Sequence, residues 1–214
     1  MVGIVFLVSN VPFLTTGDLF VLLRLDRATW AAGQIVSLFA ISILYSLGLF
    51  ALFVIVLLPC LTFSTFGWGT VVNTLAQTNA AHELGLSFEV AEMVMSQLDP
   101  VQALFCCVFF QAISGMILGC TVLVANELTH SHGGAAAAAF IVLLDLLTTN
   151  LLPARFFLFS PVSHSRLQIL DFLGTSFFYP TPYMAVAYDI VLLIVLSGLS
   201  AILLINLDIE QNVR

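Results

Sequence analysis

Long apolar runs separated by short polar stretches dominate the hydropathy pattern of this 214-residue chain. The runs are unbroken, and a helix satisfies every backbone group of an unbroken run in lipid. The strands of a membrane barrel would instead alternate over about ten residues. The pattern therefore predicts an all-α, polytopic helical membrane protein with about five transmembrane segments. These segments cover 1–14, 33–59, 101–126, 134–152 and 183–207.

The first apolar run differs from the others because it is short. A helix needs about 20 residues to cross a bilayer, and the run over 1–14 is interrupted by Pro12. We expect this run to be a clipped span, with an upstream segment missing or unassigned.

The polar stretch over 15–32 is predicted to be an amphipathic helix lying in the membrane interface. Arg24 and Arg27 are three residues apart, so a helix places them on one face. Leucines cover another face, and a tryptophan favours the headgroup level. The residues that would face a partner here are Asp18, Arg24, Asp26, Arg27 and Trp30.

The distribution of charge predicts how the chain is oriented. The connection over 60–100 is acidic and contains no basic residue, which places it outside the cell together with the connection over 153–182. Arginines near short loops favour the cytoplasm. The stretches 15–32, 127–133 and 208–214 are therefore expected to be cytoplasmic, and residues 1–214 to form a single transmembrane domain in the cell membrane.

Composition narrows the function. The hydrophobic fraction is 61% and the charged fraction 8%, whereas a soluble domain carries roughly 25% charged residues. The net charge of −7 argues against nucleic acid as a partner. Because the chain has no lysine, it cannot contain the Gly-x-x-x-x-Gly-Lys loop that binds ATP. We expect no enzymatic activity and no cofactor, and the lipid bilayer is the first partner.

Two carboxylates stand inside apolar runs, Asp145 and Asp189. An intramembrane carboxylate is a functional candidate by default, as part of an ion relay or a polar pathway. The alternative is that each carboxylate lies near a water-accessible opening at the membrane surface, paired with Arg155 or Arg166. If either carried protons, a proton-coupled carrier would become a rival function. Gln34 is a polar position in another span, where it could line the same pathway or join helices by hydrogen bonds.

Small residues four apart, Gly115 and Gly119, predict close helix packing, within the chain in preference to a dimer. His130 and His132 lack the further ligands that a stable metal site needs, so no metal is expected.

One enzymatic alternative rests on the stretch Ala112-Ile113-Ser114-Gly115. It loosely resembles the Gly-x-Ser-Gly of rhomboid intramembrane proteases, whose serine pairs with a histidine on a later span. Here the first glycine is missing, and His164 falls in a connection between spans.

Four stretches share the order of features of one transporter family. They are Val11-Pro12-Phe13 followed by Leu22-Leu23-Arg24, Arg27, Trp30, Gly33 and Gln34; Leu44-Tyr45 with Leu57-Leu58-Pro59; Phe159-Ser160-Pro161-Val162-Ser163 with Leu167; and Tyr179-Pro180 with Tyr183, closing at Asp208-Ile209-Glu210. In these stretches the chain resembles the permease subunits of type 2 ABC transporters, common in bacteria, particularly their small uncharacterised Gram-positive branch. The likeness covers most of the chain through loose, mostly apolar motifs.

The resemblance implies a membrane-spanning subunit of an ATP-driven exporter. Two such permease subunits would pair, as a homodimer or a heterodimer, and each would dock a separate ABC-type ATPase through the helix around Asp18 to Trp30. Family members usually have six spans, a cytoplasmic N-terminus and lysines near the C-terminus. This chain offers about five spans and carries Asn206, Asp208 and Glu210 instead. The alternatives are a non-transporting immunity or sensing subunit and, further off, the intramembrane protease.

Overall fold

The computed structural model describes residues 1–12, 25–58, 67–78, 83, 92–129, 133–151, 153–174 and 178–206. Every regular element within these residues is helical, which confirms the expected all-α class. The elements are α1 (Val2–Val8), α3 (Arg27–Leu57), α4 (Thr70–Gln77), α6 (Glu92–Gln97), α7 (Pro100–Thr129), α8 (Gly134–Asn150), η2 (Ala154–Phe159), α9 (Pro161–His164), η3 (Leu167–Ile169) and α10 (Pro182–Ile205).

Three of these helices, α3, α7 and α10, are long and apolar enough to cross a membrane. They contain 31, 30 and 24 residues, and a bilayer core requires about 20. Helix α8 is apolar but has 17 residues, which span about 26 Å. Helix α1 has only 7 residues, or about 10 Å, so it cannot span a bilayer. The chain is therefore a helical membrane protein in which three of the five expected segments reach full spanning length.

Helix α3 corrects the expected boundary between an interfacial helix over 15–32 and a span from Gly33. One continuous helix runs from Arg27 to Leu57, with Asp26 as its N-cap. No proline interrupts this stretch, and a glycine inside a helix, such as Gly33 at the expected boundary, costs only about 1 kcal/mol. Trp30 is buried in the core, which holds the first turns in line with the rest of the helix. Residues 13–24 of the expected interfacial helix lie outside the described residues.

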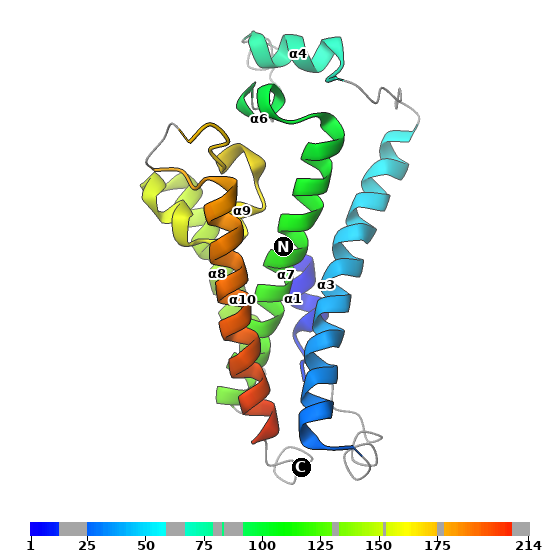
Figure 1. The fold of residues 1–214 in the computed structure, drawn as a ribbon, viewed down its shortest axis with the longest axis vertical. Coiled ribbons are helices and arrows are strands. Elements are labelled where there is room, and N and C mark those ends of the chain that lie inside the picture. Colours follow the sequence, from blue (N-terminus) through cyan, green and yellow to red (C-terminus); the bar gives the residue numbers. More distant parts are fainter. Residues whose placement is uncertain are drawn as a thin grey trace.

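Helix α7 forms the centre of the bundle and contacts α1, α3, α8 and α10 (Figure 1). In its most apolar 18-residue stretch 61% of the residues are buried, against 11% in α3 and 17% in α10. Helices α3, α7, α8 and α10 alternate in direction along the bundle (Figure 1). The C-terminal turns of α8 and the N-terminal turns of α10 consequently lie at the same end.

Small residues let α7 approach its neighbours closely. A Cβ atom added at Gly115 would lie 2.6 Å from Cδ1 of Ile4 and 3.4 Å from Cβ of Ser42. A Cβ at Gly119 would lie 3.4 Å from Cδ2 of Leu38. Both glycines therefore face α1 and α3 of the same chain, and the space that they leave is filled by intramolecular contacts.

The faces of α3 and α10 that point away from α7 carry large exposed apolar side chains, as a surface solvated by lipid acyl chains does. On α3 they include Val36, Leu44, Leu52, Phe53 and Val56, and on α10 they include Val191, Ile194, Val195 and Ile202.

Asn126 near the end of α7 joins the chain after α1 to the beginning of α8. Its Nδ2 donates to the carbonyl oxygens of Ser9 at 3.2 Å and Val11 at 2.6 Å, and its Oδ1 accepts from the Gly134 N–H at 2.7 Å. A Cβ at Gly134 would lie 2.2 Å from the carbonyl oxygen of Val122. Only glycine therefore lets α8 begin this close to α7.

Replacing Gly134 with valine should destabilise the bundle, because the new side chain would collide with the α7 backbone. We expect a loss of about 1–3 kcal/mol, seen as a lower midpoint when folded protein remaining after heating in detergent is measured by size-exclusion chromatography. Gly48→Val is the matched control, since nothing lies within 4 Å of a Cβ at Gly48. Equal midpoints for the two variants would contradict the close approach of α7 and α8.

Candidate functional site

The single-turn helix α9 lies inside the bundle although it belongs to the connection between α8 and α10. All four of its residues, Pro161 to His164, are buried. The Ser160 side chain caps it by accepting from the Ser163 N–H, and Pro161 occupies the first turn. Serine at the N-cap followed by proline is a favourable helix start, because proline has no N–H that would need a partner there.

Three helices each hold α9 by one polar side chain. From α7, the Ser114 hydroxyl lies 2.7 Å from the carbonyl oxygen of Pro161. From α8, the Asp145 carboxylate accepts from the Ser163 hydroxyl at 2.5 Å. From α10, Oδ1 of Asp189 lies 2.9 Å from Nδ1 of His164. We call these residues the α9 anchor: Ser114, Asp145, Pro161, Ser163, His164 and Asp189.

Asp145 also forms an ion pair with Arg166, which follows α9. Nη2 of Arg166 donates to Oδ2 of Asp145, and Nη1 donates to the Thr149 hydroxyl at 2.8 Å. The carboxylate side chain is 2% exposed and the guanidinium side chain 31%. The pair therefore has a buried anionic end and a cationic end that still reaches the surface.

His164 is enclosed on both sides. Its Nε2 lies 3.1 Å from the carbonyl oxygen of Phe157, and the ring meets that of Tyr188 edge-on, with centroids 5.9 Å apart. The side chains of His164 and Asp189 are both 0% exposed. Oδ2 of Asp189 has no hydrogen-bond partner within the described part of the chain.

The structure assigns partners to the two carboxylates that the sequence left open between Arg155 and Arg166. Arg166 pairs with Asp145, whereas the Arg155 guanidinium lies 5.1 Å from the centroid of the Phe178 ring. Asp189 takes His164, a residue that sequence reasoning left in a loop. The signal that could have found this pairing is the stretch Ser-His-Ser-Arg over 163–166, which lies between two runs that each bury a carboxylate.

Gln34 is not brought to this site. It lies two turns into α3, a helix that begins at the end of the bundle opposite α9 (Figure 1), and its carbonyl oxygen accepts from the Ser37 hydroxyl at 2.7 Å. A role for Gln34 in a polar pathway stays a prediction. Asp145 and Asp189 share a site, because α8 and α10 both present them to α9.

Among the expected docking residues, Asp18 and Arg24 lie outside the described residues. Asp26 and Arg27 are exposed at the beginning of α3. Trp30 is 5% exposed and contributes to the core beside α1 and α7. Apolar contacts within the bundle cover its ring, and its position at the headgroup level stays a prediction.

Within the described residues, Ser114 and His164 form hydrogen bonds with other partners and not with each other. The Ser114 hydroxyl bonds the carbonyl oxygens of Phe110 and Pro161, while the two ring nitrogens of His164 meet Phe157 and Asp189. A serine hydrolase needs the hydroxyl and the imidazole within hydrogen-bond reach.

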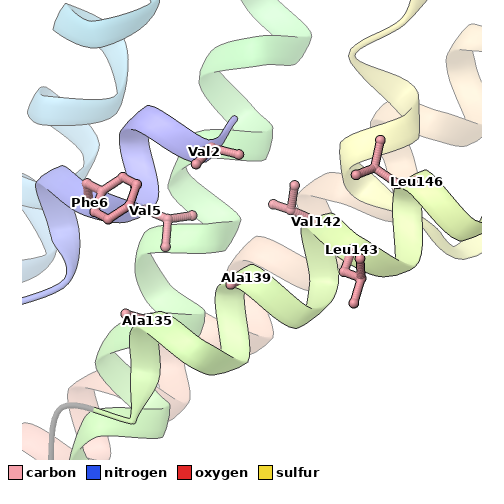
Figure 2. A pocket seen from close by; sticks show the side chains of 8 residues that line it. All are labelled: Val2, Val5, Phe6, Ala135, Ala139, Val142, Leu143 and Leu146. Carbon is pink, nitrogen blue, oxygen red and sulfur yellow. The ribbon is translucent and has the colours of Figure 1, made fainter.

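Apart from the α9 anchor, the chain has an apolar pocket of about 260 Å³ between α1 and α8 (Figure 2). It is lined by Val2, Val5 and Phe6 of α1 and by Ala135, Ala139, Val142, Leu143 and Leu146 of α8. The small side chains of Ala135 and Ala139 leave this space open. The pocket offers no polar group for chemistry, so the α9 anchor is the candidate functional site.

Comparison with known proteins identifies no relative: no family model matches the chain, and no curated protein or solved structure is detectably similar to it. The site is therefore interpreted from its own geometry.

Arg166→Met should destabilise the protein more than Asp145→Asn does. The first change leaves a buried carboxylate without its counter-charge, which costs about 3–5 kcal/mol, whereas the exposed guanidinium can turn to water when Asp145 is neutral. The midpoint of thermal unfolding in detergent measures the loss of stability in each variant. The double variant, with both Arg166→Met and Asp145→Asn, should lose less stability than the two single variants added together.

The control for this comparison is Arg155→Met, which removes a surface cation–π contact worth about 0.5–1 kcal/mol. Strictly additive losses in the double variant would show that Arg166 and Asp145 do not act as a pair.

Proposed function

We propose that this protein is the membrane-spanning permease subunit of an ATP-driven exporter, working in the cell membrane with a separate ATPase and a second permease subunit. The observation that carries transport is the pair of buried carboxylates that meet α9 between otherwise apolar helices. Intramembrane carboxylates are costly and typically belong to the pathway or switch of a transporter. The partner ATPase rests on the resemblance of the sequence to type 2 ABC permeases and on the absence of lysine.

The proposed mechanism uses α9 as the part of the permease that responds to helix movement. ATP binding would draw two ATPases together, and the movement would pass to the permeases through the segment that precedes α3. Because α9 is hydrogen-bonded to α7, α8 and α10 at once, a relative shift of these helices strains its contacts. The anchor then has a docked and an undocked arrangement, which is what alternating access requires.

The docking surface in this proposal lies at the beginning of α3. Asp26 and Arg27 are exposed there, and Asp18 and Arg24 precede them in the chain. Charged side chains at a rim set the rate and specificity of association. An ATPase with a complementary surface would therefore recognise this end of the bundle.

In the proposed orientation the end of the bundle at which α3 begins is cytoplasmic, and the end that carries α4 is extracellular. Single cysteines at Asn73 and Ser131, introduced after the native cysteines are replaced, test this. A membrane-impermeant thiol reagent added to intact cells should label the cysteine at 73 and leave the one at 131 unlabelled until the membrane is opened. The opposite pattern would overturn both the orientation and the docking surface.

The ATPase partnership has its own test. Protein purified from its native membrane should carry ATPase activity, and Arg24→Glu with Arg27→Glu should reduce that activity at least about tenfold, the equivalent of 1.4 kcal/mol in binding. The matched control is Arg155→Glu at the other end of the bundle, which should keep it. Retention of the ATPase by the double variant would rule out docking through this segment.

Two other classes stay open to the same experiments. An immunity or sensing subunit would bind its partner without sustained export when protein and ATPase are reconstituted together. An intramembrane protease would lose cleavage on Ser114→Ala, whereas unchanged cleavage would exclude Ser114 as its nucleophile.

A further inference from the structure

The hydrogen atoms on His164 can be assigned from its neighbours. Nε2 lies 3.1 Å from the carbonyl oxygen of Phe157, and a carbonyl oxygen only accepts, so Nε2 must carry a hydrogen. Nδ1 lies 2.9 Å from Oδ1 of Asp189. A hydrogen bond there requires one further hydrogen, either on Nδ1 or on Oδ1.

That further hydrogen sets the charge of the site. With it, His164 and Asp189 are either an imidazolium beside a carboxylate or a neutral imidazole beside a carboxylic acid. Moving the proton from Nδ1 to Oδ1 converts one form into the other, and the total charge stays zero. Without it, two lone pairs would face each other and a net negative charge would be buried. Both side chains are 0% exposed, which makes an uncompensated charge costly.

The other titratable groups around the pair are already engaged. Asp145 has Ser163 and Arg166 as partners. The Tyr188 hydroxyl donates to the carbonyl oxygen of Phe159 at 3.2 Å.

In the connection between η3 and α10, Oδ1 of Asp171 accepts from the N–H groups of Leu173 and Gly174 at 3.0 and 2.9 Å. The guanidinium of Arg155 lies over Phe178. Within the described residues, His164 is therefore the group that can neutralise Asp189.

We propose that His164 and Asp189 form a proton-binding site that holds one shared proton while α9 is docked and exchanges it with water when α9 leaves α10. The Asp189 carboxylate uses one oxygen for His164, and its buried Oδ2 has no partner within the described residues. A purely structural carboxylate would have both oxygens satisfied. An acceptor left open beside α9 is suited to a group that changes partners when α9 leaves α10. The site requires no ATPase, so it stands independently of the proposed exporter function.

The test keeps His164 as the single histidine, through His82→Gln, His130→Gln and His132→Gln in the full chain. The protein is labelled with ¹⁵N-histidine and studied in lipid nanodiscs between pH 5 and 9. We expect a proton on Nε2 and a shared proton between Nδ1 and Oδ1 of Asp189. The shared proton appears either as an Nδ1–H signal or as a carboxylic acid band in the infrared spectrum.

Each outcome decides the proposal. An Nδ1–H together with the Nε2–H, or an acid band that Asp189→Asn removes and Asp145→Asn leaves, supports it. A neutral ring without an acid band overturns it. The nuclear magnetic resonance measurement leaves Asp189 unchanged, so it stands even if Asp189→Asn fails to fold.

Exchange with deuterated water tests the role of α9. Ser163→Ala removes the bond from α9 to α8 without altering the pair, and the loss of one hydrogen bond should speed exchange of the shared proton about fivefold. Arg155→Met, which removes a contact with Phe178 and none of the hydrogen bonds that hold α9, should leave the rate unchanged. An unchanged rate in Ser163→Ala would refute the dependence of exchange on docking.

Discussion

Asp145 and Asp189 are placed by their helices inside an otherwise apolar bundle, and a buried carboxylate is costly unless a donor reaches it. Neighbouring residues of α9 supply the hydrogen-bond partners, Ser163 to the first and His164 to the second. This requirement draws a segment that would otherwise lie at the surface into the space between α7, α8 and α10. The need of the two carboxylates for partners therefore sets the arrangement of this end of the bundle, including the course of the chain between α8 and α10.

Close approach of the helices makes the anchor geometrically possible. Gly115 follows Ser114 on α7 and lets α1 and α3 approach from one side, while the Ser114 hydroxyl reaches Pro161. Nearer the C-terminal end of α7, Asn126 satisfies two carbonyl oxygens and the first N–H of α8. Polar contacts thus hold α7 at its middle and near its C-terminal end, and the apolar side chains of Leu118, Val122 and Leu123 pack in the core between them. Dispersion and hydrogen bonds stabilise helix association in lipid, where the hydrophobic effect between helices is weak.

A segment tied to three helices also connects their movements. Helices α8 and α10 each give one carboxylate to α9, so neither can shift along the other without a change at these bonds. The two bonds differ in their chemistry. Asp145 has a permanent cation in Arg166, whereas Asp189 depends on a histidine whose charge follows a proton. One side of the anchor is therefore electrostatically constant, and the other can change.

The unbroken apolar runs determined the helical membrane fold and the approximate positions of α3, α7, α8 and α10, because each run must satisfy its own backbone in lipid. They also identified Asp145 and Asp189 as exceptional, since charge inside such a run is costly wherever the chain folds. The partners of these carboxylates were decided only by the tertiary structure. Arg166 and His164 are 21 and 25 residues away from theirs, and periodicity within a helix carries no information about contacts at that separation. For the same reason the burial of Trp30 was set by neighbouring helices and not by its own sequence context.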